Sequence, residues 1–190
     1  MNTELDIDLD LQTVLLTPQQ LDEITTRMAT QITADYKEGA FGSRPLVMIC
    51  VLKGAVMFYT DLVRKMERPV ELEFVKVTSY GAGTVSSGQL KMHLDLFRTD
   101  YSNLNILLVE DITDSGRTLS KLTQLFRDRG AHSVRCCTLL DKPDRREVDF
   151  TPDYIGAVIP DEFVVGYGLD YNERYRDLPY IGILRPEIYS

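Results

Sequence analysis

The sequence predicts an α/β protein whose core is an open, mostly parallel β-sheet flanked by helices. Two unbroken apolar runs, Leu46–Leu52 and Ile106–Val109, carry this prediction, because such runs are typical of strands buried on both faces, as in parallel sheets. Each run leads through a small turn into apolar residues at helical spacing, at Phe58 and Leu62 after the first run and at Leu122 after the second. This alternation of strand and helix is the pattern of an α/β fold.

The composition is that of an ordinary soluble protein. The 190 residues fit one domain with a substantial core. Hydrophobic residues make up 44% of the chain and charged residues 26%, which is typical of globular proteins. No apolar run approaches the length of a membrane span, and the acidic N-terminus lacks the basic and apolar regions of a signal peptide. We therefore expect no membrane partner.

The cysteines and the net charge limit which cellular compartment and which binding partners we expect. Cys50 lies in an apolar strand pattern, and Cys136 and Cys137 are adjacent, so we expect buried free thiols in a reducing compartment, the cytoplasm. The net charge of -8 comes without a basic stripe, which argues against a nucleic-acid partner. The same charge weakly repels anions, so an anionic ligand would need local backbone N–H groups, a few placed cations and Mg²⁺.

Start and stop signals predict the other elements. Thr17 and Gln20 form a capping box with Pro18 at the first helical position, so a helix begins there and ends before Gly39. Strands are expected at Glu71–Ser79, Ser133–Leu140 and Tyr154–Val158, with a shorter one at Phe163–Val165. The segment 79–88 contains three glycines and four Ser or Thr residues, which predicts a mobile loop.

The turn after the second apolar run has the features of a phosphate-binding site. Residues Thr113–Gly116 form a small polar turn before a helix that is expected to begin at Thr118. The first N–H groups of a helix lack intrahelical partners, and the helix dipole favours an anion there. Ser115 and Thr118 add hydroxyl donors, and Gly116 lets a phosphate approach the backbone closely.

Three carboxylates, Glu110, Asp111 and Asp114, surround the same turn. A simple phosphate site would not place acids beside a polyanion, because like charges repel. The acids make sense if the ligand also carries sugar hydroxyls, a divalent cation or a proton to be removed.

The string Val109–Thr118 closely resembles the phosphoribosyl-diphosphate (PRPP) signature of the type I phosphoribosyltransferases, in the version of the hypoxanthine-guanine branch. Three further segments resemble that family in the same order along the chain: the triplet Leu52–Gly54, the loop from Ser79, and the run Pro160–Leu178. The resemblance implies a single phosphoribosyltransferase domain over residues 1–190, with a small hood of N- and C-terminal segments over the strand ends. It also implies the salvage reaction that joins hypoxanthine or guanine to PRPP at purine N9.

The resemblance assigns roles to the acids and to the phosphate turn. The 5′-phosphate would be held by four consecutive residues: Ser115, Gly116, Arg117 and Thr118. Glu110 and Asp111 would take the ribose hydroxyls or a Mg²⁺ ion bridging them, with Asp170 as a second metal anchor. Asp114, also part of the PRPP site, is the expected general base and would contact purine N7.

Further roles concern the diphosphate and the purine. The expected diphosphate ligands are Lys53, Gly54, Ser79, Tyr80 and Arg176, with a cis peptide bond before Lys53 and the Ser79–Tyr80 loop as a lid that excludes water. Lys142 would donate to the purine 6-oxo group, and Phe163 would stack on the purine face. The backbone carbonyls of Val164 and Asp170 would accept from the 2-amino group of guanine.

Two alternatives remain open at this point. One is a regulatory protein of the same fold that senses PRPP or nucleotides, against which the intact Asp114 and Lys142 argue. The other is a phosphoribosyltransferase that prefers xanthine. The resemblance also suggests a homodimer or homotetramer, although no stretch of the sequence marks an interface.

Overall fold

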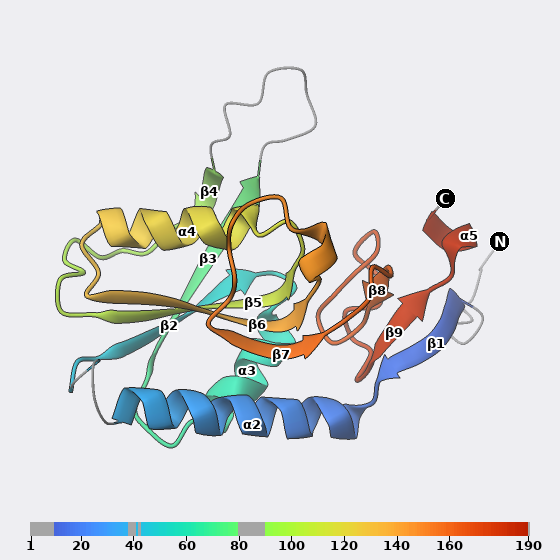
Figure 1. Ribbon diagram of the computed structural model, residues 1–190, viewed down its shortest axis with the longest axis horizontal. Helices are drawn as coiled ribbons and strands as arrows, with labels where there is room; N and C mark the ends of the chain where they lie inside the picture. Colours follow the sequence, from blue (N-terminus) through green and yellow to red (C-terminus); the bar gives the residue numbers. More distant parts are fainter. Residues whose placement is uncertain (1–9, 38–40, 42, 80–89, 190) are drawn as a thin grey trace.

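The computed structural model describes every residue except 1–9, 38–40, 42, 80–89 and 190. Its main element is a six-stranded sheet with the strand order β4-β3-β2-β5-β6-β7 (Figure 1). The strands are β2 (Leu46–Leu52), β3 (Glu71–Ser79), β4 (Leu90–Leu94), β5 (Asn105–Thr113), β6 (Ser133–Asp141) and β7 (Tyr154–Val158). All neighbouring strands pair in parallel except β3 and β4, which confirms the predicted α/β class.

Helices cover both faces of this sheet (Figure 1). Helices α2 (Pro18–Lys37) and α3 (Val56–Arg64) pack on one face, and α4 (Arg117–Asp128) packs on the other. The predicted capping box at the start of α2 is confirmed: Thr17 N donates to Gln20 Oε1 at 2.9 Å, and Gln20 N donates to Thr17 Oγ1 at 3.3 Å. Between β6 and β7 lies a short 3₁₀ helix, η1 (Pro143–Arg145).

A second, smaller sheet faces the carboxyl ends of β6 and β7 (Figure 1). It contains β1 (Leu11–Leu16), β9 (Ile181–Leu184) and β8 (Val164–Val165), paired antiparallel in that order. The short helix α5 (Pro186–Tyr189) follows β9. We call these elements, with the turn that leads from β8 to β9, the hood. The hood has its own apolar core.

The central strand is longer than predicted. The sequence placed Glu110 and Asp111 after the end of this strand, but β5 continues through both residues to Thr113. The reason is its partner: parallel pairing with β6 continues to the Thr113–Asp141 pair and keeps the backbone extended. Helix α4 begins at Arg117, one residue before the predicted start.

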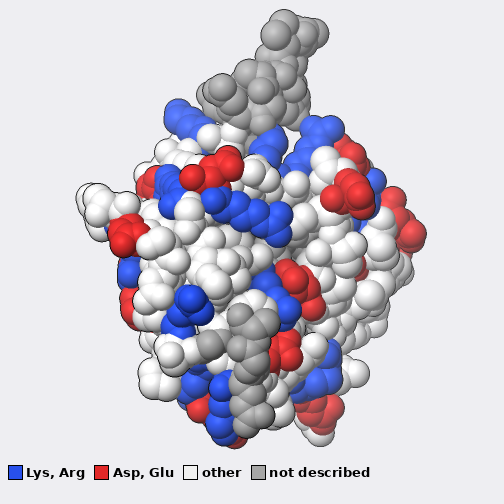
Figure 2. All heavy atoms as spheres, turned by 60° about the vertical axis from the view of Figure 1, so that its left-hand side comes forward, with Lys and Arg blue, Asp and Glu red and all other residues white. Residues whose placement is uncertain are grey.

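The predicted free thiols are confirmed, since all three cysteines are buried and unpaired. None of the described helices is long and apolar enough to cross a membrane. Figure 2 shows the molecule turned so that the end of the main sheet remote from the hood comes forward. On that face Lys and Arg side chains are interspersed with Asp and Glu, so neither sign of charge dominates it.

Candidate active site

The phosphate turn is a tight connection between β5 and α4. Gly116 caps α4 with a φ of 77°, in the left-handed region that favours glycine. A Cβ atom at this position would lie 2.8 Å from Arg146 Cδ, so the turn also lacks room for a side chain. The first turn of α4 holds no acidic residue, which leaves its positive end available to an anion. A cavity of about 90 Å³ opens here and is lined by Glu110, Ile112, Thr113, Asp114, Ser115, Gly116, Thr118 and Leu119.

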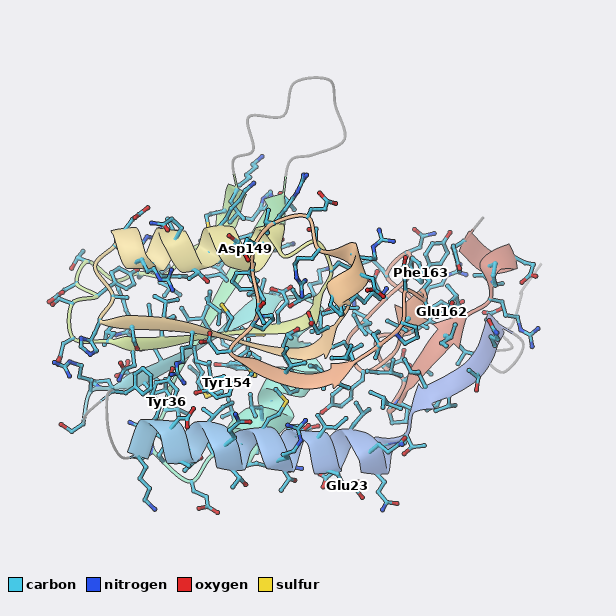
Figure 3. The ribbon with its side chains drawn as sticks, in the orientation of Figure 1. Glu23, Tyr36, Asp149, Tyr154, Glu162 and Phe163 are labelled. Carbon is cyan, nitrogen blue, oxygen red and sulfur yellow. The ribbon has the colours of Figure 1, made fainter. Side chains whose placement is uncertain are left out.

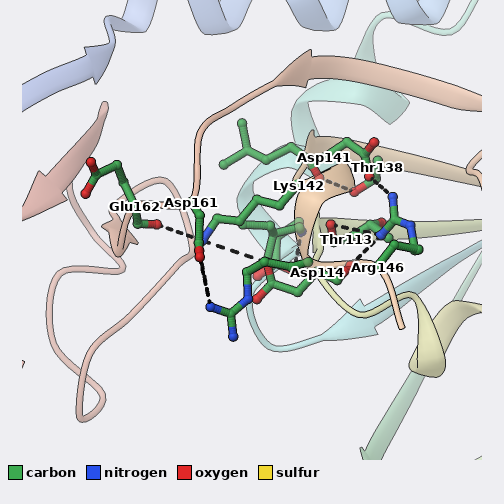
Figure 4. A network of polar contacts seen from close by, with 12 residues as sticks. Thr113, Asp114, Thr138, Asp141, Lys142, Arg146, Asp161 and Glu162 are labelled. Carbon is green, nitrogen blue, oxygen red and sulfur yellow. Dashed lines mark hydrogen bonds and ion pairs between the residues drawn. The ribbon is translucent and has the colours of Figure 1, made fainter. Parts of the chain in front are cut away.

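The segment after β6 stabilises this turn through hydrogen bonds from Arg146 (Figure 4). The Arg146 guanidinium donates to the carbonyl oxygens of Thr113, at 3.3 Å, and Asp114, and it pairs with the carboxylate of Asp141. The side chains of Arg146 and Asp141 are only 15% and 5% exposed. Sequence reasoning did not identify Arg146, because it appears only as one charge in a run of charged residues.

The side chain of Arg117 already has an anionic partner. Its guanidinium pairs with Glu147, and its backbone N donates to Ser115 Oγ at 3.4 Å. Any contribution of Arg117 to phosphate binding would therefore come from its backbone in this arrangement.

Glu110 and Asp111 form a pair of acids on β5, and neither makes an ion pair with a cation among the described residues, although the charge of Arg176 acts to lower the pKa of Asp111. Burial, together with the neighbouring Asp111 carboxylate, raises the pKa of Glu110 well above its usual range. Burial raises the pKa of Asp111 to about 6, although the Ile112 N–H bond to its carboxylate acts in the opposite direction. Glu110 Oε2 is buried and has no hydrogen-bond partner among the described residues. Nearby positive charge therefore compensates this pair only in part.

Glycines bring two other segments against this acid pair. A Cβ atom on Gly54 would lie 1.6 Å from Asp111 Oδ2, so only glycine fits at this contact. A Cβ atom on Gly168 would lie 2.0 Å from the carbonyl oxygen of Gly54. The peptide bond between Leu52 and Lys53 is cis, as the resemblance implied. The ends of β2 and β5 and the turn after β8 therefore meet at one place.

The predicted diphosphate cations lie on that turn and beside it. Lys53 Nζ donates to Glu173 Oε2 at 2.9 Å. Arg176 Nη2 lies 2.8 Å from Asp170 Oδ1 and 3.4 Å from Glu173 Oε1. Four non-glycine residues of the turn have positive φ values: Tyr167 (51°), Asn172 (51°), Glu173 (63°) and Tyr175 (74°). Such backbone strain clusters at functional sites.

A cavity of about 390 Å³ separates the end of β6 from the hood. Lys142 is 7% exposed, and its Nζ donates to the Glu162 carbonyl oxygen at 2.7 Å. The same nitrogen lies 3.8 Å from the Oδ1 atoms of Asp114 and Asp161 (Figure 4). The ammonium group is thereby fixed between three oxygens at the cavity wall.

The wall of this cavity combines predicted and unpredicted residues. The predicted ones are Asp114, Lys142, Phe163, Val164 and Asp170, and the unpredicted ones are Ile112, Arg145, Asp161, Glu162, Leu169 and Tyr189. Figure 3 places Glu162 and Phe163 together at the hood side. The Phe163 ring stacks on Tyr189 with centroids 4.7 Å apart and an interplanar angle of 23°. Ile112 could have been found only by extending β5 past the two acids; most of the other positions depend on contacts between segments far apart in sequence.

Asp114 is common to both cavities, since it lines the small one at the phosphate turn and the large one under the hood. The predicted Tyr80 lies outside the described residues, and Ser79 is the last residue of β3. Among the described residues, no group of three or more His, Cys, Asp and Glu side chains is arranged to hold a metal ion. The predicted metal set Glu110, Asp111 and Asp170 therefore stays a prediction.

Known proteins resemble this chain in sequence and in fold. The family model for the phosphoribosyl transferase domain matches residues 15–172. The bifunctional protein TilS/HprT of Listeria innocua is 51% identical over 181 residues, and the chain spans 27% of its length. The hypoxanthine-guanine phosphoribosyltransferase of Staphylococcus aureus is 44% identical over 95% of this chain and 98% of its own.

The fold agrees with these relatives. A crystal structure of a hypoxanthine phosphoribosyltransferase from Staphylococcus aureus has a TM-score of 0.89 at 43% identity, over 97% of both chains. The chain belongs to the phosphoribosyl transferase family, in the branch of the hypoxanthine-guanine phosphoribosyltransferases.

Proposed function

We propose that the chain transfers the 5-phosphoribosyl group of PRPP to N9 of hypoxanthine or guanine, giving the nucleoside monophosphate and diphosphate. One observation carries this proposal: Asp114 forms part of the wall of both cavities. A sugar phosphate in the small cavity and a base in the large one would have their junction beside this carboxylate. That junction is where the glycosidic bond forms.

The ribose phosphate would bind at the turn between β5 and α4. The 5′-phosphate takes the N–H groups of Ser115–Thr118 and the hydroxyl groups of Ser115 and Thr118. The diphosphate takes the backbone of Lys53 and Gly54 and the side chain of Arg176. In this proposal the loop from Ser79 to Tyr80 closes over it.

The acid pair on β5 fits a magnesium ion. Glu110 Oε2 is a buried acceptor without a donor among the described residues, and the pKa of the adjacent Asp111 carboxyl is raised despite the charge of Arg176. Mg²⁺ is typically held by one or two carboxylates together with substrate oxygens, so Glu110 and Asp111 would hold it against the ribose hydroxyls, with Asp170 as a second anchor. The ion would neutralise charge that develops on the leaving diphosphate.

The large cavity would select a 6-oxopurine. The Lys142 ammonium is a donor and matches a 6-oxo acceptor, whereas the 6-amino group of adenine is itself a donor. Phe163 stacks on the purine face, and the carbonyl oxygens of Val164 and Asp170 accept from a 2-amino group. Asp114 takes a proton at N7 as carbon–nitrogen bond formation proceeds.

The Asp114→Asn variant tests the catalytic role. General base catalysis typically contributes about 10²–10⁴-fold, so kcat should fall by about that factor while PRPP binding, measured by calorimetry with Mg²⁺, is retained. Full turnover by Asp114→Asn would overturn the proposed role of this residue.

A substrate panel tests the rest. Hypoxanthine, guanine, xanthine and adenine are each supplied with PRPP and Mg²⁺, and the absorbance change is followed. Turnover of hypoxanthine and guanine is expected. Turnover of none would favour a regulatory protein, turnover of xanthine above the others would reverse the base preference, and turnover of adenine alone would contradict the role of Lys142.

We also propose a cellular compartment and an oligomeric state. Three buried free thiols suit the reducing cytoplasm. A homodimer or homotetramer is proposed as the working assembly, which sedimentation of the purified chain would test.

A further inference from the structure

The proposed purine-stacking residue is itself held by two tyrosines of the hood. The Phe163 ring stacks on Tyr189 at 4.7 Å and meets Tyr171 edge-on, with centroids 5.6 Å apart and an interplanar angle of 90°. Tyr189 also lines the large cavity beside Asp114 and Lys142. We infer that Tyr189 is a positioning residue that orients Phe163 for the base and so sets the affinity for the purine. This inference rests on the proposed function, because it takes Phe163 as the surface on which the base stacks.

Phe163 needs such support because of its place in the chain. It precedes the two-residue strand β8 and is half-buried, with one side toward the cavity and one toward the hood core. A half-buried ring beside a cavity has several rotamers available, and immobilising it on binding costs affinity. An aromatic pair is stabilised beyond the area that it buries. The Tyr189 ring therefore restricts Phe163 before the base arrives.

Helix α5, which ends at Tyr189, is attached to the chain at the start of β1. Arg185 N donates to the Asp10 carbonyl oxygen at 3.0 Å, and Arg185 Nε donates to the Leu11 carbonyl oxygen at 3.1 Å. Ile188 N donates to the Arg185 carbonyl oxygen at 3.0 Å, which closes the turn of α5. These contacts fix the backbone of α5, which carries Tyr189 as its last residue.

The contribution of Tyr189 comes from its ring rather than its hydroxyl group. Within the described part of the chain, Tyr189 contacts Phe163 by ring stacking, and its hydroxyl forms no hydrogen bond with another residue. Phenylalanine has the same ring, so Tyr189→Phe should preserve the effect and Tyr189→Ala should remove it.

The test separates purine affinity from stability. For Tyr189→Ala, the KM for hypoxanthine should rise about 2- to 12-fold, which corresponds to the usual strength of one aromatic pair. The KM for PRPP and kcat should stay within about twofold of the wild type, as expected for an effect on base binding alone. Tyr189→Phe should restore the wild-type KM.

Tyr180→Ala is the matched control, because Tyr180 packs on the same hood core without lining the cavity. It should lower Tm without a selective change in the KM for hypoxanthine. Equal KM changes for both substrates in Tyr189→Ala, matching those of Tyr180→Ala, would reduce Tyr189 to a structural residue. An unchanged KM for hypoxanthine in Tyr189→Ala would also overturn the inference. A wild type without turnover of any 6-oxopurine would instead refute the proposed function, and this inference with it.

Discussion

The two acidic regions of the site have opposite electrostatic environments. On β5, Glu110 and Asp111 make no ion pair with a described cation, and burial raises both pKa values although the charge of Arg176 opposes the rise at Asp111. On the turn after β8, Lys53 and Arg176 surround Glu173, and the hydrogen bond from Lys53 lowers the pKa of that carboxyl. The acid pair on β5 lacks an ion-pair partner among the described residues, whereas Glu173 is paired with two cations. The difference suggests that the free protein is prepared for a cation on β5 and has to exchange one anion for another on the turn.

The largest expected effect comes from breaking the contact between these two regions. Gly54→Ala would place a Cβ atom 1.6 Å from Asp111 Oδ2, so Lys53 or the acid pair must shift. A misplacement of about 1 Å can cost about 10²-fold in rate, and kcat/KM should fall by about that factor in steady-state assays.

Gly130→Ala is the control for this substitution. Gly130, unlike Gly54, has a positive φ of 86°, and nothing lies within 4 Å of an added Cβ, so this variant should lose stability through backbone strain and keep its activity. A fully active Gly54→Ala variant would show that the two regions are independent.

The second prediction removes one negative charge from the Glu110–Asp111 pair. Asp111→Asn should raise the Tm of the ligand-free protein at about pH 8, because it relieves repulsion with Glu110 and the burial of a charge. Affinity for PRPP with Mg²⁺ should fall by about 10-fold or more, since hydrogen bonds to charged groups contribute roughly 1.5–3 kcal/mol.

Thermal unfolding and calorimetry measure both effects. Glu23→Gln, a charge-matched change on the exposed side of α2 (Figure 3), should alter neither. A lower Tm for Asp111→Asn would contradict the view that the pair destabilises the free protein.

The third prediction concerns pH. Because the pKa of Asp111 is about 6 in the folded chain and near 4 in an unfolded chain, the folded chain binds more protons between these values. The free energy of unfolding therefore falls as pH rises through this window. The Tm of the ligand-free protein should decrease from about pH 4.5 to about pH 7, by roughly 2–4 °C for each kcal/mol lost.

The double variant Glu110→Gln/Asp111→Asn isolates the contribution of the pair. Its Tm should change less over the same pH range than that of the wild type. Parallel curves for the two proteins would assign the pH dependence to other groups.

The smallest effect is expected on the compensated turn. Glu173→Gln removes the anion shared by Lys53 and Arg176, so diphosphate should bind more tightly. The pairs are exposed, with 49% and 65% of the Lys53 and Glu173 side chains accessible, and exposed pairs contribute about 0.2–1 kcal/mol. The Kd for diphosphate should therefore decrease by no more than about fivefold.

Asp177→Asn removes the same charge from the same turn, and among the described ion pairs Asp177 has none with either cation. The Kd for diphosphate should change less in this variant than in Glu173→Gln. An equal decrease in both would mean that net charge, and not the position of Glu173, controls the affinity.

Local signals were enough to predict most of the main sheet. The bounds of β2, β3 and β7 match the predicted ranges residue for residue, because uniform burial or regular alternation is visible in sequence. The end of β5 was missed because it depends on pairing with β6. The acids and the phosphate turn were predicted from one contiguous string.

The rest of the site was beyond local reasoning. Gly54 was expected beside the diphosphate, but its contact with Asp111 joins residues 57 positions apart. Arg146 and Tyr189 act through a carbonyl and a ring whose positions follow only from the completed fold. Pair contacts of this kind leave no periodic signal along the chain.

The pairing of β1 with β9 has a consequence for synthesis. Leu11 opposes Leu184 across the hood, so this sheet forms only after nearly all of the described chain has left the ribosome. The phosphate turn depends on β6 and on Arg146 but on no strand of the hood, so it can form earlier, because contacts between segments close in sequence form before distant ones. A nascent chain would thus form its proposed sugar-phosphate site before the hood completes the cavity that is proposed to select the base.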